Sequence, residues 1–123
     1  MRFNHSILGG TFDHFHAGHA HFTRAAFDKS QNVTIGLTSN KFAQSKPFPH
    51  IIEDYQVRRK NLESFLEKNN FMRRATIVVI NNIYGTTLGE KDIDAIFVTA
   101  HGLAAARKIN HERLKLLFPK LII

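Results

Sequence analysis

The sequence contains no cysteine and no tryptophan, and only three of its 123 residues are proline. The absence of cysteine excludes disulfide bonds, thiolate metal sites and cysteine nucleophiles. No apolar run approaches the roughly 18 residues that a membrane-spanning helix needs. The first residues, MRFNHS, lack the apolar core of a secretory signal. These absences predict a cytoplasmic protein that has no membrane partner.

Acidic residues are also scarce, with ten Asp and Glu against seventeen Lys and Arg, so the formal net charge is +7. Such a surplus favours anionic partners, either phosphorylated metabolites or nucleic acid. The basic residues are scattered, however, and form only short runs such as Arg58-Arg59-Lys60. A dedicated nucleic-acid binder more often concentrates them in a stripe with interleaved aromatic residues. The charge pattern therefore favours small phosphorylated ligands over nucleic acid, and it leaves the oligomeric state open.

The length of 123 residues suits one domain with its own hydrophobic core. Short apolar runs alternate with longer amphipathic stretches, which predicts the α/β class. We expect a Rossmann-like open parallel sheet of about five strands, with helices on both faces and right-handed crossovers. The expected strands cover residues 6–8, 33–37, 75–80, 95–98 and 121–123, and the expected helices cover residues 18–27, 53–67 and 103–117. Residues 39–50, which contain two prolines, and residues 81–90 are predicted as loops.

The end of the sequence is apolar. Residues 121–123 are predicted to begin the fifth strand, in parallel beside the fourth and near Phe97 and Val98. A natural terminus usually ends in polar residues, so this ending predicts a sequence that is truncated at its C-terminal end. We still expect residues 1–123 to fold as a single domain.

The most informative segment is GGTFDHFHAGH at residues 9–19, which follows the first predicted strand and opens the first predicted helix. In an open parallel sheet, ligands bind beyond the carboxyl ends of the strands. Glycines there let backbone N–H groups approach a phosphate, and the helix N-terminus adds a positive dipole. His16 and His19 lie on either side of Gly18, so both imidazoles can face one crevice. Two such donors can stabilise the negative charge that develops on a transferring phosphoryl group.

This segment closely resembles the nucleotidyltransferase superfamily motif, glycine-threonine-phenylalanine-aspartate followed by histidine-x-glycine-histidine. Its two-histidine signature is also similar to that of class I aminoacyl-tRNA synthetases. VTIGLTSN at residues 33–40 resembles the second strand of archaeal and eukaryotic-type phosphopantetheine adenylyltransferases. Residues 83–88, 94–99 and 108–110, followed by Arg113, are similar to later parts of the same family. The likeness covers nearly the whole chain.

The resemblance implies attack by the phosphate of 4′-phosphopantetheine on the α-phosphorus of ATP, giving dephospho-CoA and pyrophosphate, with Mg²⁺ accompanying the nucleotide. It implies that His16 and His19 stabilise the α-phosphate and that Lys46 grips the incoming phosphate. It also implies a nucleotide-binding set made of Gly9, Gly10, Thr11, Phe12, Asp13 and Thr99. For Asp13 a second role stays open, which is to order the loop by capping backbone N–H groups.

Two departures from the family keep alternatives open. The chain stops before the serine- and threonine-rich segment that usually follows the fifth strand. After the fourth strand it has Thr99-Ala100-His101-Gly102, where archaeal relatives tend to carry a glutamate. One alternative is a different nucleotidyltransferase, such as one that uses CTP and a phosphorylated alcohol. The other is a nucleotide-binding module without full catalytic activity.

Several further residues have two possible interpretations. Histidines 14, 16, 19 and 21 form a cluster with the residue types of a metal site, but the motif already accounts for two of them, so no metal site is predicted. One of Arg58 and Arg59 is expected to reach phosphate. Tyr84 and Gly85 form either a turn or part of the substrate wall, with the turn favoured. Lys108 and Arg113 are expected to point outward unless their match to the family places them near nucleotide.

Overall fold

The computed structural model describes residues 2–44, 52–99 and 102–123. Lys46, which the family resemblance implies grips the incoming phosphate, lies outside the described residues. In chain order the elements are β1 (Phe3–Gly10), α1 (Ala17–Lys29), β2 (Ser30–Thr38), α2 (Asn40–Gln44), α3 (Tyr55–Lys68), the 3-10 turn η2 (Met72–Arg74), β3 (Ala75–Ile80), β4 (Ala95–Phe97) and α4 (Leu103–Lys115). Within the described ranges, none of the helices has the length and apolar character needed to cross a membrane.

The four strands form one sheet in the order β3-β2-β1-β4, and every neighbouring pair is parallel. Leu8 of β1 pairs with Ile35 of β2 on one side and with Phe97 of β4 on the other. β2 and β3 follow on one side of β1, whereas β4 lies on the other side, so the order in which strands are added reverses between β1 and β4. This is the switch point at which open α/β sheets bind ligands. The predicted fold class is therefore confirmed.

The predicted fifth strand takes the form of a single parallel bridge between Ala95 and Ile122. The Ile122 N–H donates to Asp94 O at 3.0 Å, and the Ile96 N–H donates to Ile122 O at 2.7 Å. The expected parallel pairing beside the fourth strand is therefore confirmed for one residue pair, and Ile122 and Ile123 line a small pocket together with Phe97 and Val98. The side chain of Asn110 explains the register, because it both donates to and accepts from the backbone of Leu121.

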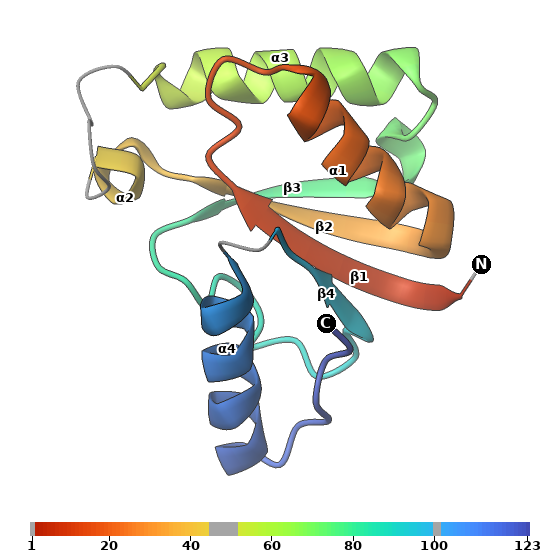
Figure 1. Cartoon of the computed structure of the whole chain (residues 1–123), viewed down its shortest axis with the longest axis vertical. Coiled ribbons are helices and arrows are strands. Elements are labelled where there is room, and N and C mark those ends of the chain that lie inside the picture. The colour runs from red at the N-terminus through yellow and green to blue at the C-terminus, as the bar shows by residue number, and fades with distance from the viewer. Residues whose placement is uncertain (1, 45–51, 100–101) are drawn as a thin grey trace.

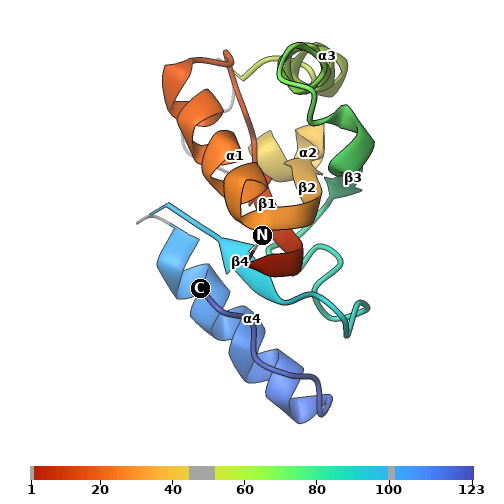
Figure 2. The same ribbon diagram turned by 90° about the vertical axis from the view of Figure 1, so that its right-hand side faces the viewer.

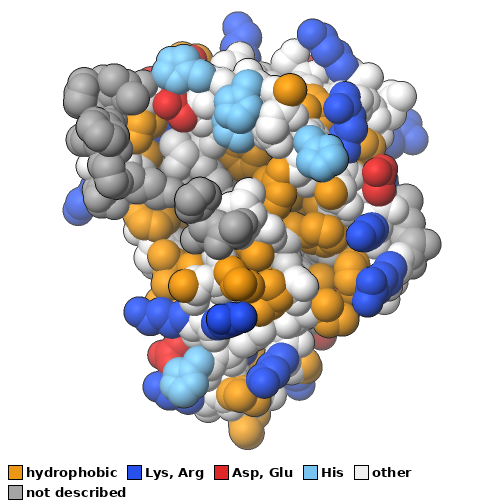
Figure 3. All heavy atoms as spheres, in the orientation of Figure 1, with side chains coloured by type: hydrophobic (Ala, Val, Ile, Leu, Met, Phe, Trp, Pro, Cys, Tyr) orange, Lys and Arg blue, Asp and Glu red, His pale blue; other side chains and the backbone are white. Residues whose placement is uncertain are grey.

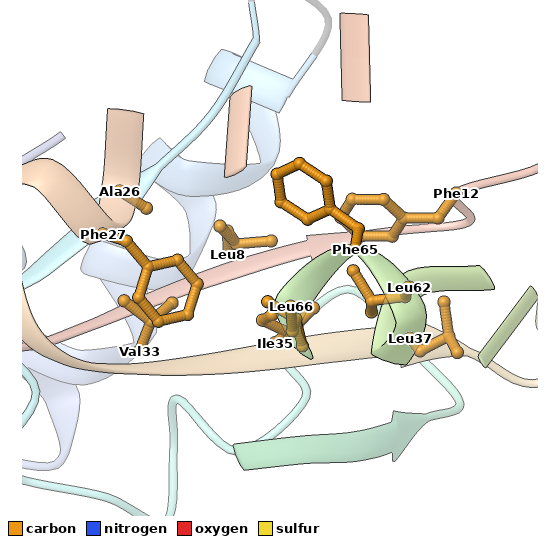
Figure 4. Packing of buried hydrophobic residues seen from close by; sticks show 10 residues of the cluster. All are labelled: Leu8, Phe12, Ala26, Phe27, Val33, Ile35, Leu37, Leu62, Phe65 and Leu66. Atoms are coloured by element: carbon orange, nitrogen blue, oxygen red, sulfur yellow. The ribbon is translucent and has the colours of Figure 1, made fainter. Parts of the chain in front are cut away.

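Helices cover both faces of the sheet (Figures 1 and 2): α1 and α3 lie on one face, and α4 lies on the other. Successive residues of β1 supply the two cores, because side chains alternate across a strand. Leu8 belongs to the core under α1 and α3, and Ile7 belongs to the core over α4. Figure 4 shows the larger core, in which α3 points Leu62 and Leu66 at the sheet.

One predicted loop is wrong at its start. Residues 40–44 form α2, although residues 39–50 were expected to lack regular structure because of their prolines. Both prolines lie beyond this helix, so they do not oppose it. Ser39 begins the helix, since its Oγ accepts the Phe42 N–H at 3.1 Å and its carbonyl accepts the Ala43 N–H.

Candidate active site

The two motif histidines form a reciprocal cap at the start of α1. His16 is the N-cap residue, and its Nδ1 accepts the Gly18 N–H at 3.0 Å. The Nδ1 of His19 accepts the His16 N–H at 3.2 Å, and the two rings stack with centroids 3.9 Å apart. A neutral imidazole that accepts through Nδ1 carries its proton on Nε2. The cap therefore leaves each ring with an Nε2–H donor on the side opposite the helix backbone.

Gly18 has a steric reason to be glycine. A Cβ atom at this position would lie 2.9 Å from Cε1 and 3.1 Å from Nδ1 of His16. Any side chain would therefore force the His16 imidazole to shift from this position. The histidine-x-glycine-histidine spacing is thus a local packing requirement as well as a chemical signature.

Burial lowers the pKa of His19 below its ordinary value of 6.5, and the neighbouring His16 lowers it further. Asp13 opposes both effects but does not overcome them. The neutral form is the one that can accept the His16 N–H. Electrostatics and hydrogen bonding therefore favour the same protonation state.

The loop between β1 and α1 contains two unusual backbone conformations. Phe12 and His14 both have positive φ values, 50° and 47°, which side chains other than glycine adopt only where the surroundings enforce them. Phe12 is 3% exposed and belongs to the larger core. Figure 4 shows its ring on the same side of the sheet as Leu62 and Phe65. The buried Phe12 side chain therefore anchors the loop to the core between the sheet and the helices α1 and α3.

Asp13 makes the contacts of a loop-ordering residue. Its Oδ1 accepts the Glu53 N–H at 2.8 Å, and its Oδ2 lies 3.0 Å from His14 Nδ1. Burial on its own would raise the pKa of Asp13, but these two contacts and the charge of Arg58 bring it below its usual value. The side chain is therefore an anion that is held in place by protein donors.

Among the described residues, Asp13, His14 and Glu53 also form a group whose residue types and spacing could hold a metal ion. One ligand atom from each lies within 4.8 Å of the others. The same atoms have protein partners, since Glu53 Oε1 accepts the His14 N–H at 2.7 Å. His14 is also exposed to solvent. Hydrogen bonds between the motif loop and Glu53 account for the arrangement.

A cavity of about 260 Å³ opens at the carboxyl ends of the strands. Its wall is largely apolar and includes three of the predicted nucleotide-binding residues: Gly9, Gly10 and Thr99. His16 and His19 do not line it. Figure 3 shows apolar side chains in the hollow between α1 and α4, with histidine side chains gathered along the α1 side. The histidines thus lie along one edge of this face, and the cavity adjoins the glycine turn of the same motif.

Tyr84 and Gly85 form the turn that the sequence favoured, and both also lie beside the cavity. Asn82 Oδ1 accepts the N–H groups of Tyr84 and Gly85 at 2.9 and 3.1 Å, which forms the turn. Gly85 has a φ of 52°, and a Cβ atom there would lie 3.0 Å from Ile80 Cγ2. Both Tyr84 and Gly85 also line the cavity. The turn therefore serves to shape the cavity wall.

Arg58 is the principal residue whose place the sequence did not predict. It is fully buried and donates to Glu53 O, Thr11 O, Thr38 Oγ1 and Asn40 Oδ1. Arg59 instead contacts the Tyr55 hydroxyl at 3.1 Å. A signal did exist, because Arg58 lies four residues before Leu62 on the apolar stripe of α3.

Arg113 is buried as well, so the expectation that it points outward is wrong. Its guanidinium donates to four backbone carbonyls, those of Thr87, Glu90, Lys91 and Pro119. These bonds hold the segment after the cavity turn against α4. Lys108, by contrast, is exposed as expected.

Comparison with known proteins agrees with this geometry. The family model described as cytidylyltransferase-like matches residues 7–121. The phosphopantetheine adenylyltransferase of Pyrococcus abyssi is 41% identical over 113 residues, which cover 92% of this chain and 71% of that protein. The enzyme of the same name from Methanopyrus kandleri is 34% identical over 122 residues, which cover 99% of this chain and 77% of that protein.

A solved structure shares the fold. It is a crystal structure of a protein with unknown function from Archaeoglobus fulgidus, with a TM-score of 0.83 and 29% sequence identity. The match covers 96% of this chain and 94% of that chain. The two-histidine cap, the parallel sheet and these relatives together lead to one conclusion. The chain belongs to the cytidylyltransferase-like family, in which its relatives include archaeal phosphopantetheine adenylyltransferases.

Proposed function

We propose that this protein is a pantetheine-phosphate adenylyltransferase, which transfers AMP from ATP to 4′-phosphopantetheine and forms dephospho-CoA and pyrophosphate. The observation that carries the proposal is the reciprocal cap of His16 and His19, in a chain related to enzymes of that name. The cap leaves an Nε2–H donor on each ring at the start of α1. Such a site suits a reaction in which negative charge shifts between phosphate oxygens.

In the proposed reaction, a phosphate oxygen of 4′-phosphopantetheine attacks the α-phosphorus of ATP. A new P–O bond forms, the bond to the bridging oxygen breaks, and that oxygen leaves with pyrophosphate. His16 and His19 donate through Nε2–H to oxygens of the α-phosphate, and the positive end of the α1 dipole adds to this. No protein nucleophile is needed, because positioning and charge stabilisation supply the catalysis.

The remaining motif residues prepare the phosphate site. Gly9 and Gly10 let the backbone approach the nucleotide closely, and Thr11 offers a hydroxyl next to them. Phe12 and Asp13 act through the loop, the first by anchoring its base and the second by capping the Glu53 N–H. Each contributes to nucleotide binding without presenting its side chain to the cavity.

Two assignments in the proposal rest on family resemblance. Lys46 would grip the phosphate of the incoming acceptor as a point charge. Thr99, which is exposed and lines the cavity, would contact the nucleotide. Mg²⁺ would enter as part of the MgATP substrate, with phosphate oxygens among its ligands.

The direct test is pyrophosphate release from purified protein with ATP, Mg²⁺ and 4′-phosphopantetheine. We expect release that requires both substrates, and we expect it to be lost in His16→Ala. The matched control is His21→Ala, which removes an exposed histidine from the same helix and should retain activity. Binding of ATP without any pyrophosphate release would instead favour a nucleotide-binding module.

A second candidate is a cytidylyltransferase, which the description of the matching family model favours. Thermal stabilisation separates the two nucleotides. ATP should raise the melting temperature more than CTP at equal concentration, because only the preferred nucleotide binds the native state tightly. Stabilisation by CTP and not by ATP would indicate that CTP is the nucleotide substrate of the proposed reaction.

A further inference from the structure

Three glycines from separate parts of the chain surround the side chain of Ile80, the last residue of β3. A Cβ atom at Gly36 of β2 would lie 2.9 Å from Ile80 Cγ2 and 3.2 Å from its Cδ1. A Cβ atom at Gly85 would lie 3.0 Å from the same Cγ2, and one at Gly9 of β1 would lie 3.5 Å from Cδ1. Because β2 lies between β3 and β1, the Ile80 side chain extends across a glycine to reach β1.

Ile80 and the three glycines also line the cavity at the carboxyl ends of the strands. Ile80 is 9% exposed, so the surrounding chain holds most of its side chain in place. Neither of the two core clusters of the described residues includes it. A glycine within a strand forgoes side-chain packing and often marks a close approach of a ligand or another segment. At Gly36 the approaching group is Ile80, which therefore sets the level of the cavity wall.

The chemistry of the cavity selects the kind of group that it can take. No described residue of its wall is charged, and apolar side chains such as Phe22, Ile83 and Phe97 form much of it. Burying a phosphate against such a wall would leave its charge without partners, which is costly. The wall therefore suits the uncharged part of a substrate. Both substrates of the proposed reaction have one, the adenosine of ATP and the pantetheine arm of the acceptor.

We propose that Ile80 is a specificity-determining residue, which forms the floor of this cavity and sets how deeply the uncharged part of one substrate enters. The inference rests on the proposed function, because it takes the two substrates of that reaction as the ligands. A smaller side chain at position 80 lowers the floor and removes a contact. A side chain at position 36 displaces Ile80, because its Cβ atom would meet Cγ2 at 2.9 Å.

The experiment measures the binding of ATP and of 4′-phosphopantetheine separately by calorimetry, in the wild type and in Ile80→Val. This variant removes Cδ1, the atom that reaches toward Gly9 and Gly36. We expect the dissociation constant of one substrate to rise about fourfold, the effect of one lost apolar carbon contact, and that of the other to change by less than about 1.5-fold. The affected substrate is the one whose uncharged part lies on the floor.

The matched control is Ile93→Val, which removes the same atom from a residue that is also buried. Ile93 belongs to the core beside α4 and is not part of the cavity wall. It should lower the melting temperature to a similar extent and leave both dissociation constants unchanged. A merely structural role of Ile80 predicts the same result for Ile80→Val as for this control.

A compensating pair supplies the second readout. Gly36→Ala should weaken the same substrate, because Ile80 has to shift. Ile80→Ala removes the atoms that Gly36→Ala would meet and leaves a space next to them. The double variant should therefore bind that substrate more tightly than either single variant does. Additive losses would show that the two positions do not form one floor.

The outcomes separate this inference from the proposed function. Wild type that binds neither ATP nor 4′-phosphopantetheine would contradict the proposed function. Wild type that binds its substrates would overturn the floor alone if Ile80→Val left both dissociation constants unchanged or raised both equally. Should Ile80→Val fail to fold, Ile80→Leu decides, because it keeps the side-chain volume but moves a methyl group, and the floor requires one substrate to respond selectively.

Discussion

The two faces of the sheet each bury an arginine completely, and the two arginines serve different ends. On the α3 side, Arg58 bonds to oxygens around the motif loop. On the α4 side, Arg113 bonds to the carbonyls of Thr87, Glu90 and Lys91, and to that of Pro119 beyond the helix. Both thus donate to backbone carbonyls in irregular parts of the chain.

The electrostatic surroundings of the two arginines differ. Burial lowers the pKa of Arg58, while the nearby acidic groups Asp13, Asp54 and Glu53 oppose that effect. For Arg113, burial lowers the pKa and is the sole cause. A buried guanidinium is therefore a general means of holding a loop in place. Whether such a loop contributes to the reaction depends on its residues. Of the two loops, the one that Arg58 holds contains the histidine motif.

The largest difference between the two faces should appear in turnover. His19→Ala removes one Nε2–H donor from the α1 side, and losing a single charge-stabilising donor typically lowers the rate about 10²- to 10³-fold. ATP affinity should stay within a few-fold. The measurement is steady-state pyrophosphate release together with ATP binding. Normal turnover in this variant would show that the reaction occurs elsewhere.

The α4 side should respond in stability. Arg113→Met leaves four carbonyls without their donor, and we expect the free energy of unfolding to fall by about 3 kcal/mol. Urea unfolding measures this change. The ratio of adenosine to ATP dissociation constants should stay within about twofold of wild type, because Arg113 has no bond to the motif. If this ratio fell clearly in Arg113→Met, the distinction between a motif-side arginine and a purely structural one would be wrong.

Two glycine substitutions, one on each face of the sheet, test the same comparison and should have smaller effects. Gly18→Ala places a methyl group 2.9 Å from His16 Cε1, so the imidazole must shift, which should weaken its cap. We expect a loss of stability of about 1 kcal/mol and roughly tenfold slower turnover. Gly89→Ala is the control on the other face, since its Cβ atom would lie at an ordinary 3.7 Å from Thr86 O. A similar loss in both variants would refute the steric role of Gly18.

The smallest expected effect is the contribution of His19 to the pH dependence of stability. Its folded pKa lies below its ordinary 6.5, so the unfolded state binds more protons as the pH falls through that value. The contribution of His19 is therefore fully present above pH 6.5 and is lost on acidification. Urea unfolding between about pH 5 and pH 8 should show a decline that is shallower in His19→Ala. An identical slope in both proteins would contradict the lowered pKa.

Local signals in the sequence were sufficient for the general architecture. The alternation of apolar runs and amphipathic stretches predicted the parallel α/β sheet, and the helices α1, α3 and α4 begin and end within a few residues of their expected limits. The sequence also predicted that His16 and His19 lie together, since they are within a single helical turn, although the reciprocal cap that they form was not predicted. Contacts of this range depend on spacing alone, which a sequence displays directly.

Periodicity also contained a signal for the buried arginines. Arg58 lies on the stripe of Leu62, Phe65 and Leu66, and Arg113 lies on the stripe of Ala106 and Ile109. The charge of an arginine nevertheless favours the prediction that its side chain is exposed, because ionised groups are rarely buried without partners. What makes burial possible here is a set of carbonyl and hydroxyl acceptors from other parts of the chain.

Those acceptors are what only the tertiary structure decided. Arg58 is separated from Thr11 by 47 residues and from Thr38 by 20, and Thr38 is separated from Thr11 by 27. No local pattern links positions so far apart. They meet because β1 and β2 pair in parallel and end together under α3, which brings their carboxyl ends to one buried guanidinium. The sequence by itself determined the chemistry of the motif, and the sheet topology determined which residues hold that motif in place.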